Sequence, residues 1–355
     1  MTKTKENGAK TGVEIVMPRE GGPEVLEAHR RDLHGLKPGQ VMVRVEAAGV
    51  SFAEVQMLKG RYFGQPKFPV VPGYDLVGKV ESVGEGVDEG MVGKRVAALT
   101  ETGAWAERVV LGAEELAPVP DGLDPADAVS VITNGVTAWQ MLHRAAKVRP
   151  GQTVLVHGAS GGVGTLLVQL ARLAGAEVVG TASASKHEMV RAIGAIPIDY
   201  KNENVPERVR EIAPEGVDAV FDHVGGPGLV DSYRMLRRGG TLVSYGSAST
   251  LSGTGHRLRP YLPIFGRVLL CSAMPNGRRA AFYYVKRWPK LFQEDLSTVF
   301  SLLVRGEIEA RVDRRLPLER VAEALELLVS GKVSGKVVLI PNPDAGEQSV
   351  RGPRL

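Results

Sequence analysis

The pattern of apolar and polar residues changes its period near residue 126. Before that point, residues 41–45 alternate and residues 76–83 form a second strand-like run. Glycine and proline recur between such stretches, so this part predicts short strands joined by turns. Residues 126–146 have the character of a helix, which the Pro150-Gly151 turn closes. The chain therefore predicts a β-rich part followed by a different architecture.

Beyond residue 150, short apolar runs alternate with helical segments. The runs predict strands at 153–157, 177–181, 196–198, 217–224, 241–245 and 268–273. Helices are predicted between most of them, including 186–193, 204–213 and 227–237. Short apolar strands separated by helices are typical of a parallel sheet covered on both faces, and six of them suit a doubly wound Rossmann fold. The predicted fold class is therefore α/β.

The last part of the chain combines further helices and strands. Residues 276–340 predict a long helical stretch, a strand at 308–312, a helix at 318–330 and a final strand at 336–340. The basic and aromatic residues of 278–288 are interpreted mainly as helix packing, with arginine side chains that reach solvent. Residues 1–10 and 341–355 contain little that could be buried, and we expect them to be flexible tails.

Composition narrows the classes of partner and compartment. The 355 residues are 43% hydrophobic and 24% charged, with a formal net charge of +4. No basic stripe is interleaved with aromatic residues, so nucleic acid is not an expected partner. No run reaches the roughly 18 apolar residues of a membrane span, and the N-terminus lacks an apolar signal core, so no membrane association is expected. The single cysteine, Cys271, lies in an apolar run, which predicts a core residue and a protein of the reducing cytoplasm.

The most informative segment is a glycine-rich turn. Residues 153–164 read Thr-Val-Leu-Val-His-Gly-Ala-Ser-Gly-Gly-Val-Gly. Glycine lets the backbone approach a pyrophosphate, while the N-terminus of the next helix offers free N–H groups and a positive dipole end. The spacing Gly158, Gly161, Gly164 departs from the usual G-x-G-x-x-G. A strand precedes the turn, a helix follows it and a second strand begins at 177, so we predict a dinucleotide site.

The end of the second strand bears on which dinucleotide binds. An NAD site usually has an Asp or Glu here, which accepts hydrogen bonds from the ribose 2′-hydroxyl. This chain has no acid before Glu188 and offers Ser183, Ser185 and Lys186 instead. These groups suit a 2′-phosphate, so NADPH is predicted in preference to NADH. A solvated Lys186 in an NAD site without its acid is the alternative.

Several motifs occur together in a fixed order. They are AAGVSFAE at 47–54, VPGYDLVG at 71–78, VGEGV at 83–87, GVTA at 135–138, the glycine-rich turn, FDHVGG at 221–226 and GKVVL at 335–339. With these motifs, residues 13–340 resemble the zinc-free quinone oxidoreductase group of the medium-chain dehydrogenase/reductase superfamily. The resemblance implies a homodimer. It also implies a β-rich, GroES-like catalytic domain split between residues 11–131 and 276–340, with the Rossmann NADP-binding domain, residues 132–275, inserted between them.

The resemblance, the turn and the strand end together predict the cofactor contacts. The predicted residues are Thr137, Gly158, Ser160, Gly161, Gly162, Val163, Ser183, Lys186, Tyr200, His223, Tyr245, Gly246, Ser247 and Lys336. Tyr200 also fits a surface tyrosine at a strand end. The chain departs from the family at Ser51, where many members have Asn, and at His223, where a small polar residue is usual. Both departures bear on how the substrate binds.

The metal-binding positions of zinc-dependent relatives carry other residues here. Those enzymes need a Cys-like ligand near residue 51, a His-Glu pair near 74 and a four-cysteine lobe. This chain has Ser51, Tyr74 and Asp75 at those places and one cysteine in all, so we expect no zinc. Without a Lewis acid an alkoxide is poorly stabilised, whereas hydride addition to an enone or quinone spreads the charge over an enolate or phenolate. A quinone or small conjugated carbonyl compound is therefore the predicted substrate.

Tyr62 and Ser51 are the predicted catalytic residues. Residues 60–64 resemble the Gly-x-Tyr segment at the substrate mouth of quinone reductases and related enoyl-thioester reductases. A phenol with a pKa of about 10 is protonated at neutral pH, so Tyr62 can donate to the substrate oxygen; packing as a loop aromatic is the alternative. Ser51 can donate one hydrogen bond. Two other functions stay open: an enoyl-thioester reductase acting on CoA or carrier-protein substrates, and a non-catalytic NADPH-binding sensor or interaction protein.

Overall fold

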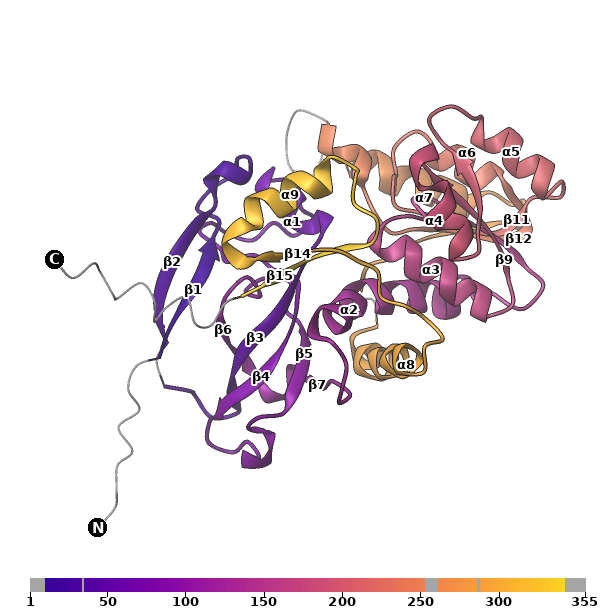
Figure 1. The fold of residues 1–355 in the computed structure, drawn as a ribbon. Coiled ribbons are helices and arrows are strands. Elements are labelled where there is room, and N and C mark those ends of the chain that lie inside the picture. Colours follow the sequence, from indigo (N-terminus) through magenta and orange to yellow (C-terminus); the bar gives the residue numbers. More distant parts are fainter. Residues whose placement is uncertain (1–9, 34, 253–260, 286–287, 342–355) are drawn as a thin grey trace, which may run out of the picture.

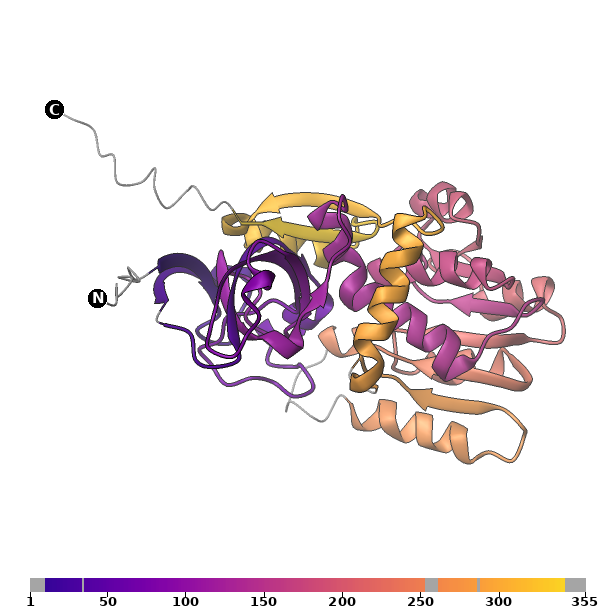
Figure 2. The ribbon, with the colours of Figure 1, turned by 90° about the horizontal axis from the view of Figure 1, so that it is seen from below.

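Two sheets of different character organise the chain. The computed structural model describes residues 10–33, 35–252, 261–285 and 288–341. One sheet has six strands that all run parallel, and the other has seven strands that are antiparallel except for one pair. Figures 1 and 2 show the two sheets side by side, with helix α2 (Pro125–Trp139) between them. The predicted α/β class is confirmed.

The parallel sheet has the strand order β10-β9-β8-β11-β12-β13. Its strands are β8 (Thr153–Val156), β9 (Glu177–Ala182), β10 (Ile196–Asp199), β11 (Val217–Asp222), β12 (Leu236–Ser244) and β13 (Arg279–Phe282). Its helices are α3 (Gly162–Leu173), α4 (His187–Ala192), α5 (Val205–Ile212), α6 (Leu229–Arg234) and α7 (Leu262–Ala273). Val154 and Val156 pack with α2, α3 and α4, whereas Leu155 packs with α5, α6 and α7. Side chains of a strand alternate between faces, so the sheet is covered on both sides, as the Rossmann prediction requires.

The strand predicted at 268–273 and the helix packing predicted at 278–288 are both wrong. Residues 268–273 lie in helix α7, and the sixth strand is β13. Ile264, Val268 and Cys271 are buried, whereas Leu269 and Leu270 are exposed. That spacing is the buried stripe of a helix, which a short apolar run cannot distinguish from a strand. Cys271 is a core residue, as predicted.

The second sheet has the order β14-β15-β3-β4-β5-β7, with β6 paired to β3. Its strands are β3 (Gln40–Val50), β4 (Asp75–Val83), β5 (Arg95–Leu99), β6 (Arg108–Gly112), β7 (Ala117–Pro118), β14 (Val312–Pro317) and β15 (Lys336–Ile340). Strands β1 (Lys10–Val16) and β2 (Glu27–Leu33) form a separate antiparallel pair. The strand predicted at 308–312 is therefore misplaced: Ile308 is buried against the parallel-sheet half, and the strand begins at Val312.

Helices α1 (Phe52–Leu58) and α9 (Val321–Val329) pack on the second sheet, and α8 (Phe292–Val304) packs against α2. A π-helical turn, Gln140–Ala146, continues α2, so the helix predicted at 126–146 is confirmed. Short 3-10 turns occupy Pro23–Val25, Glu89–Met91, Ala113–Glu115, Ala184–Lys186, Ala248–Ser252, Pro289–Leu291 and Leu318–Arg320. Within the described ranges, every helix is too short or too polar to cross a membrane.

The two halves are joined at the strand that returns from the C-terminal part. β15 pairs antiparallel with β3, so a segment far along the chain completes the N-terminal sheet (Figure 1). Just before β15, Gly335 forms an isolated parallel bridge with Gly161 of the glycine-rich turn, and its N–H donates to the carbonyl of Ser160 at 3.0 Å. The turn therefore lies directly at the boundary between the halves.

Candidate active site

The glycine-rich turn has the geometry of a phosphate-binding loop. Gly158 has φ +67°, and a Cβ on it would lie 2.5 Å from His223 Cε1. A Cβ on Gly164 would lie 2.1 Å from the carbonyl oxygen of Gly158. Helix α3 begins at Gly162, and its N-cap Gly161 has no side chain to satisfy the first N–H groups. These free donors and the close backbone packing fit the pyrophosphate of a dinucleotide.

His223 lies against this turn, after β11. Its Nδ1 atom is buried and has no hydrogen-bond partner in the described part of the chain. Burial lowers the pKa of His223, so its imidazole is neutral at physiological pH. The turn that carries it is held by Asp222 Oδ1, which accepts from the N–H groups of Val224 at 2.8 Å and Gly225 at 2.9 Å. A neutral ring with an unused nitrogen beside Gly158 can bond a ribose or phosphate oxygen.

Residues Tyr245, Gly246 and Ser247 follow β12 at the same end of the sheet. A Cβ on Gly246 would lie 2.5 Å from the carbonyl oxygen of His223, so the two turns pack closely. Ser247 is buried, and its Oγ accepts a hydrogen bond from Gln56 Nε2 of helix α1 at 2.8 Å. This bond connects the predicted cofactor site to the opposite half of the molecule. Ligands of open α/β sheets bind at this end, beyond the carboxyl ends of the strands.

The residues predicted for the 2′-phosphate lie at the edge of the sheet. Ala182 and Asp199 are paired across β9 and β10, so Ser183 and Tyr200 follow at neighbouring positions. Tyr200 is 55% exposed. Lys186 Nζ donates to the carbonyls of Gly331 and Val333, at 2.8 and 2.5 Å. Burial lowers the pKa of Lys186. The lysine therefore has protein partners, which the sequence did not predict.

Helix α2 packs against the helix that follows the glycine-rich turn. Thr137 is buried in this helix, and Asn134 lies one turn before it. A Cβ on Gly162 would lie 2.5 Å from Asn134 Nδ2, so this amide reaches the first residue of α3. Asn134 was not predicted as a site residue, because one polar residue in an apolar helix carries no signal of its own. Val163 is partly buried in the first turn of α3.

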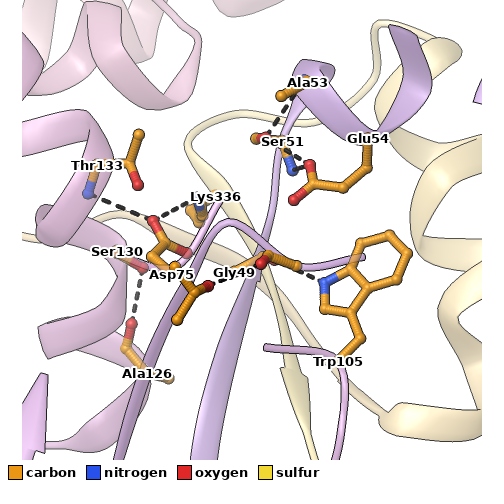
Figure 3. Close-up of polar contacts among 12 residues, drawn as sticks. Gly49, Ser51, Ala53, Glu54, Asp75, Trp105, Ala126, Ser130, Thr133 and Lys336 are labelled. Carbon is orange, nitrogen blue, oxygen red and sulfur yellow. Dashed lines mark hydrogen bonds and ion pairs between the residues drawn. The ribbon is translucent and has the colours of Figure 1, made fainter. Parts of the chain in front are cut away.

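A buried charged cluster lies between β3, β4, β15 and α2 (Figure 3). Lys336 Nζ is 3.4 Å from Asp75 Oδ2, and the two side chains are 3% and 0% exposed. A Cβ on Gly49 would lie 2.0 Å from Asp75 Oδ1, so only glycine leaves room for this ion pair. The N–H of Thr133 donates to Asp75 Oδ2 at 3.3 Å. Lys336, which was predicted at the cofactor, thus pairs with a buried acid beside the glycine-rich turn.

Ser51 is held by a second buried acid, Glu54. Ser51 is the N-cap of α1, and its Oγ donates to Glu54 Oε2 at 2.5 Å, while its own N–H donates to the same oxygen at 2.9 Å. Ser51 Oγ in turn accepts from the N–H of Ala53 at 3.3 Å, so the serine and the glutamate form a capping box. Burial raises the pKa of Glu54 from 4.5 to about 7, against the hydrogen bond from Ser51 and the charge of Lys336, which lower it. Glu54 can therefore exist in both protonation states near neutral pH.

The loop that carries Tyr62 bridges to the parallel-sheet half. The Arg61 guanidinium donates to the carbonyl of Thr250 at 2.6 Å, and Tyr261 Oη donates to the carbonyl of Arg61 at 2.7 Å. The ring of Phe63 packs against Tyr261, with centroids 5.7 Å apart. This loop therefore closes over the turn that contains Ser247. Tyr62 Oη lies 2.7 Å from Tyr74 Oη.

Many of the predicted residues fall into two groups, one on each half of the molecule. The turn at 158–163, His223, and residues 245–247 meet at one end of the parallel sheet, while Ser51 and Tyr62 lie on the other half. Ser183, Lys186 and Tyr200 lie apart, at the sheet edge. Glu54, Asp75 and Gln56 were missed as site residues. Among the described residues, no three His, Cys, Asp or Glu side chains are grouped so as to hold a metal ion.

Comparison with known proteins agrees with this architecture. The family model described as alcohol dehydrogenase GroES-like domain matches residues 37–121, and the one described as zinc-binding dehydrogenase matches residues 193–339. The chain belongs to the medium-chain dehydrogenase/reductase superfamily. Within it, the chain falls in the group of quinone oxidoreductases and VAT-1 proteins, a group of NAD(P)H reductases.

Three relatives support that placement. The synaptic vesicle membrane protein VAT-1 homolog of Rattus norvegicus is 35% identical over 315 residues, 86% of this chain and 78% of that protein. A quinone oxidoreductase of Pseudomonas aeruginosa is 34% identical over 327 residues, 90% of this chain and 97% of that protein. The crystal structure of Escherichia coli quinone oxidoreductase complexed with NADPH superimposes with a TM-score of 0.80 at 28% identity, covering 93% of this chain and 100% of that one.

Proposed function

We propose that this chain is an NADPH-dependent reductase that transfers hydride to a quinone or another α,β-unsaturated carbonyl compound without zinc. The cofactor choice is supported by the hydroxyl and lysine groups after β9, where an NAD site usually has an acid, and by the NADPH bound in the related Escherichia coli enzyme. The observation that carries the proposal is the Tyr62 hydroxyl, held by Tyr74 in a loop that bonds to the far side of the cofactor site.

The chain's own residues would perform four tasks. The turn at 158–164 binds the pyrophosphate through backbone N–H groups, and the unused Nδ1 of His223 bonds an adjacent cofactor oxygen. Arg61 and Phe63 close the loop over the site and exclude water. Bound NADPH supplies the hydride. When hydride adds to the conjugated carbon, negative charge develops on the substrate oxygen, and Tyr62 donates its proton there. Ser51 has one hydroxyl proton, which Glu54 accepts, so Ser51 becomes a second donor only when Glu54 is protonated.

The decisive experiment measures consumption of NADPH, from its near-ultraviolet absorbance, with a panel of quinones, enones and enoyl-CoA thioesters. We expect turnover with quinones or enones and a lower Kd for NADPH than for NADH. Turnover confined to enoyl-CoA would transfer the proposal to thioester substrates. Binding of NADPH, seen by fluorescence, without consumption by any acceptor would refute the reductase and favour the non-catalytic reading.

Tyr62→Phe tests the assignment of the proton donor. The ring remains and only the hydroxyl is lost, so substrate binding through packing is retained. We expect kcat to fall by about 10²-fold or more, the usual range for loss of a general acid, with the Kd for NADPH unchanged. An unchanged kcat would show that Tyr62 is not the proton donor and only lines the pocket.

We also propose a homodimer that works in the cytoplasm. Leu269 and Leu270 of α7 are 71% and 69% exposed, and α7 packs beside β13, the edge strand of the parallel sheet. An exposed apolar helix next to an open sheet edge is typical of an interface. Analytical ultracentrifugation should give a dimer that Leu269→Glu with Leu270→Glu converts to a monomer; a monomeric wild type would refute the dimer.

A further inference from the structure

Three tyrosines and a glutamate from four separate segments meet at the boundary between the two halves. Tyr62 Oη lies 2.7 Å from Tyr74 Oη, and Tyr284 Oη lies 3.4 Å from both. Tyr284 Oη donates to Glu101 Oε1 at 2.5 Å, and Tyr74 Oη lies 3.5 Å from the same oxygen. Tyr284 follows β13 of the parallel sheet, whereas the other three belong to the antiparallel half. We call these four residues the tyrosine cluster.

The backbone of Glu101, which supplies the carboxylate of this cluster, is strained. Glu101 has φ +62°, a left-handed conformation that non-glycine residues rarely adopt. Its N–H and that of Thr100 both donate to the carbonyl of Tyr74, at 3.1 and 2.9 Å, so Glu101 and Tyr74 are fixed relative to each other. Strained backbone of this kind is concentrated at functional sites. Here it brings a carboxylate within reach of two phenols.

One arrangement of the phenol protons leaves the cluster with a donor for a group outside it. Each phenol carries a single proton. Tyr284 donates to Glu101, and the 2.7 Å distance makes Tyr62 a better acceptor for Tyr74 than Glu101 at 3.5 Å. If Tyr74 donates to Tyr62, the proton of Tyr62 is left for a group outside the cluster. A substrate oxygen at Tyr62 would take that place.

The cluster also leads from the interior to solvent. Tyr74 is 4% exposed, whereas Tyr284 is 38% exposed. Burial raises the pKa values of Tyr62, Tyr74 and Tyr284, so all three phenols are neutral at physiological pH and able to donate. A line of hydroxyls with an acidic, partly exposed end is a path along which protons can move.

We propose that the tyrosine cluster is the substrate-oxygen site of this reductase, in which Tyr62 protonates the carbonyl or quinone oxygen and Tyr74, Glu101 and Tyr284 return the proton from solvent. This inference rests on the proposed function and names residues that it did not. Only Tyr62 touches the substrate. Tyr74 acts through Tyr62, and Glu101 with Tyr284 positions both and connects the halves.

The protons and electrons balance with solvent as the only added reactant. Hydride brings two electrons and one hydrogen to the conjugated carbon, and the π pair moves to the oxygen. The oxygen takes the Tyr62 proton, Tyr62 takes the Tyr74 proton, and Tyr74 takes one from water by way of Glu101. The sum is substrate plus hydride plus one solvent proton. An enone gives the enol, which then becomes the saturated ketone in water. A quinone gives a keto tautomer, which becomes the hydroquinone when the attacked carbon loses a proton and the second oxygen gains one.

Tyr74→Phe is the first test, because it removes one hydroxyl and retains a buried ring. Tyr233→Phe is the matched control: that phenol is equally buried but donates to Asn276, away from the cleft. We expect Tyr74→Phe to lower kcat by about tenfold or more, within the range of acid–base effects, with little change in KM. The solvent isotope effect should change as well: a proton inventory that is curved for the wild type, with several protons in motion, should become linear. Tyr233→Phe should leave both unchanged.

A second test does not need turnover. p-Nitrophenol ionises to a phenolate whose charged oxygen resembles the anion formed by hydride addition, and its absorbance reports this ionisation. Bound to protein loaded with NADP+, it should ionise at lower pH than in water, because Tyr62 donates to the anion. The effect should be smaller in Tyr74→Phe and in Tyr284→Phe, whose partly exposed side chain makes a folding failure less of a concern, and unaltered in Tyr233→Phe.

The outcomes separate this inference from the proposed function. If the wild type binds NADPH but consumes it with no acceptor, the proposed reductase fails. If the wild type is active and Tyr74→Phe and Tyr284→Phe match Tyr233→Phe in kcat, proton inventory and p-nitrophenol ionisation, the proposed function stands and the tyrosine cluster is overturned. A proton inventory that stays curved in Tyr74→Phe would also overturn the role of the tyrosine cluster.

Discussion

Glu54 should contribute a pH dependence to the stability of this protein, and Glu54→Gln should remove that contribution. The carboxyl has a pKa of about 7 in the folded chain against its ordinary 4.5, chiefly because it is buried. Between these two values Glu54 binds more protons in the folded chain than in the unfolded chain, so its contribution to stability falls as pH rises through this window. The group is most favourable below pH 4.5 and most costly above about pH 7.

The magnitude follows from the two pKa values. At about 1.4 kcal/mol per pH unit of separation, pKa values of about 7 and 4.5 give a total loss of about 3 kcal/mol. About 2 kcal/mol of this loss falls between pH 5.5 and pH 8 by the same relation. Gln cannot ionise, so the variant should lose about 2 kcal/mol less than the wild type over that interval.

The assay is urea unfolding followed by circular dichroism at pH 5.5 and pH 8, and the quantity compared is the change in stability between the two. Glu115→Gln is the matched control, because Glu115 likewise accepts from the backbone N–H of an N-cap residue three positions earlier, Gly112, but is exposed. It should retain the pH dependence of the wild type. If Glu54→Gln also retains it, Glu54 does not ionise within this window and the argument from burial is refuted.

Three further predictions test the cofactor site and its support. Gly158→Ala should raise the Kd for NADPH about tenfold or more without unfolding the chain, because φ +67° is strained for alanine and the new Cβ would lie 2.5 Å from His223. An unchanged Kd in a fluorescence titration would contradict this. Lys336→Met should destabilise the fold by about 3–5 kcal/mol, since it leaves the buried Asp75 without its partner. In urea unfolding, adding Asp75→Asn should restore part of the lost stability, and no restoration would count against the ion pair. Lys186→Glu should weaken NADPH by about tenfold or more and NADH much less, and equal losses in calorimetry would contradict the 2′-phosphate assignment.

Local signals explain what could be predicted from the chain alone. The strand, turn and helix around Gly158 lie within about twenty consecutive residues, and five of the six parallel strands are short apolar runs bounded by turns. Each of these features depends on residues that are close together in the sequence. The tyrosine at 62 could also be proposed, because the residues around it resemble a known segment.

Long-range contacts explain what could not be predicted. Tyr284 lies 183 positions from Glu101, and Lys186 lies 145 positions from Gly331, so neither partnership leaves a pattern in the sequence. The apolar run at 268–273 was misread because its period cannot be judged over six residues, and the true sixth strand is only four residues long. Burial also decided the chemistry of Glu54, which in the sequence is an ordinary helix-capping acid.

The bond between Gly335 and Ser160 has a consequence for how the molecule can open. It fastens the phosphate-binding turn to the strand that carries Lys336, at a point inside the boundary of the two halves. Any parting of the halves must therefore pivot near this point rather than be a simple separation. Such a movement would have to break other contacts between the halves, among them those of Arg61 with Thr250 and of Tyr284 with Glu101. Reactants would enter and leave there while the dinucleotide keeps its anchorage.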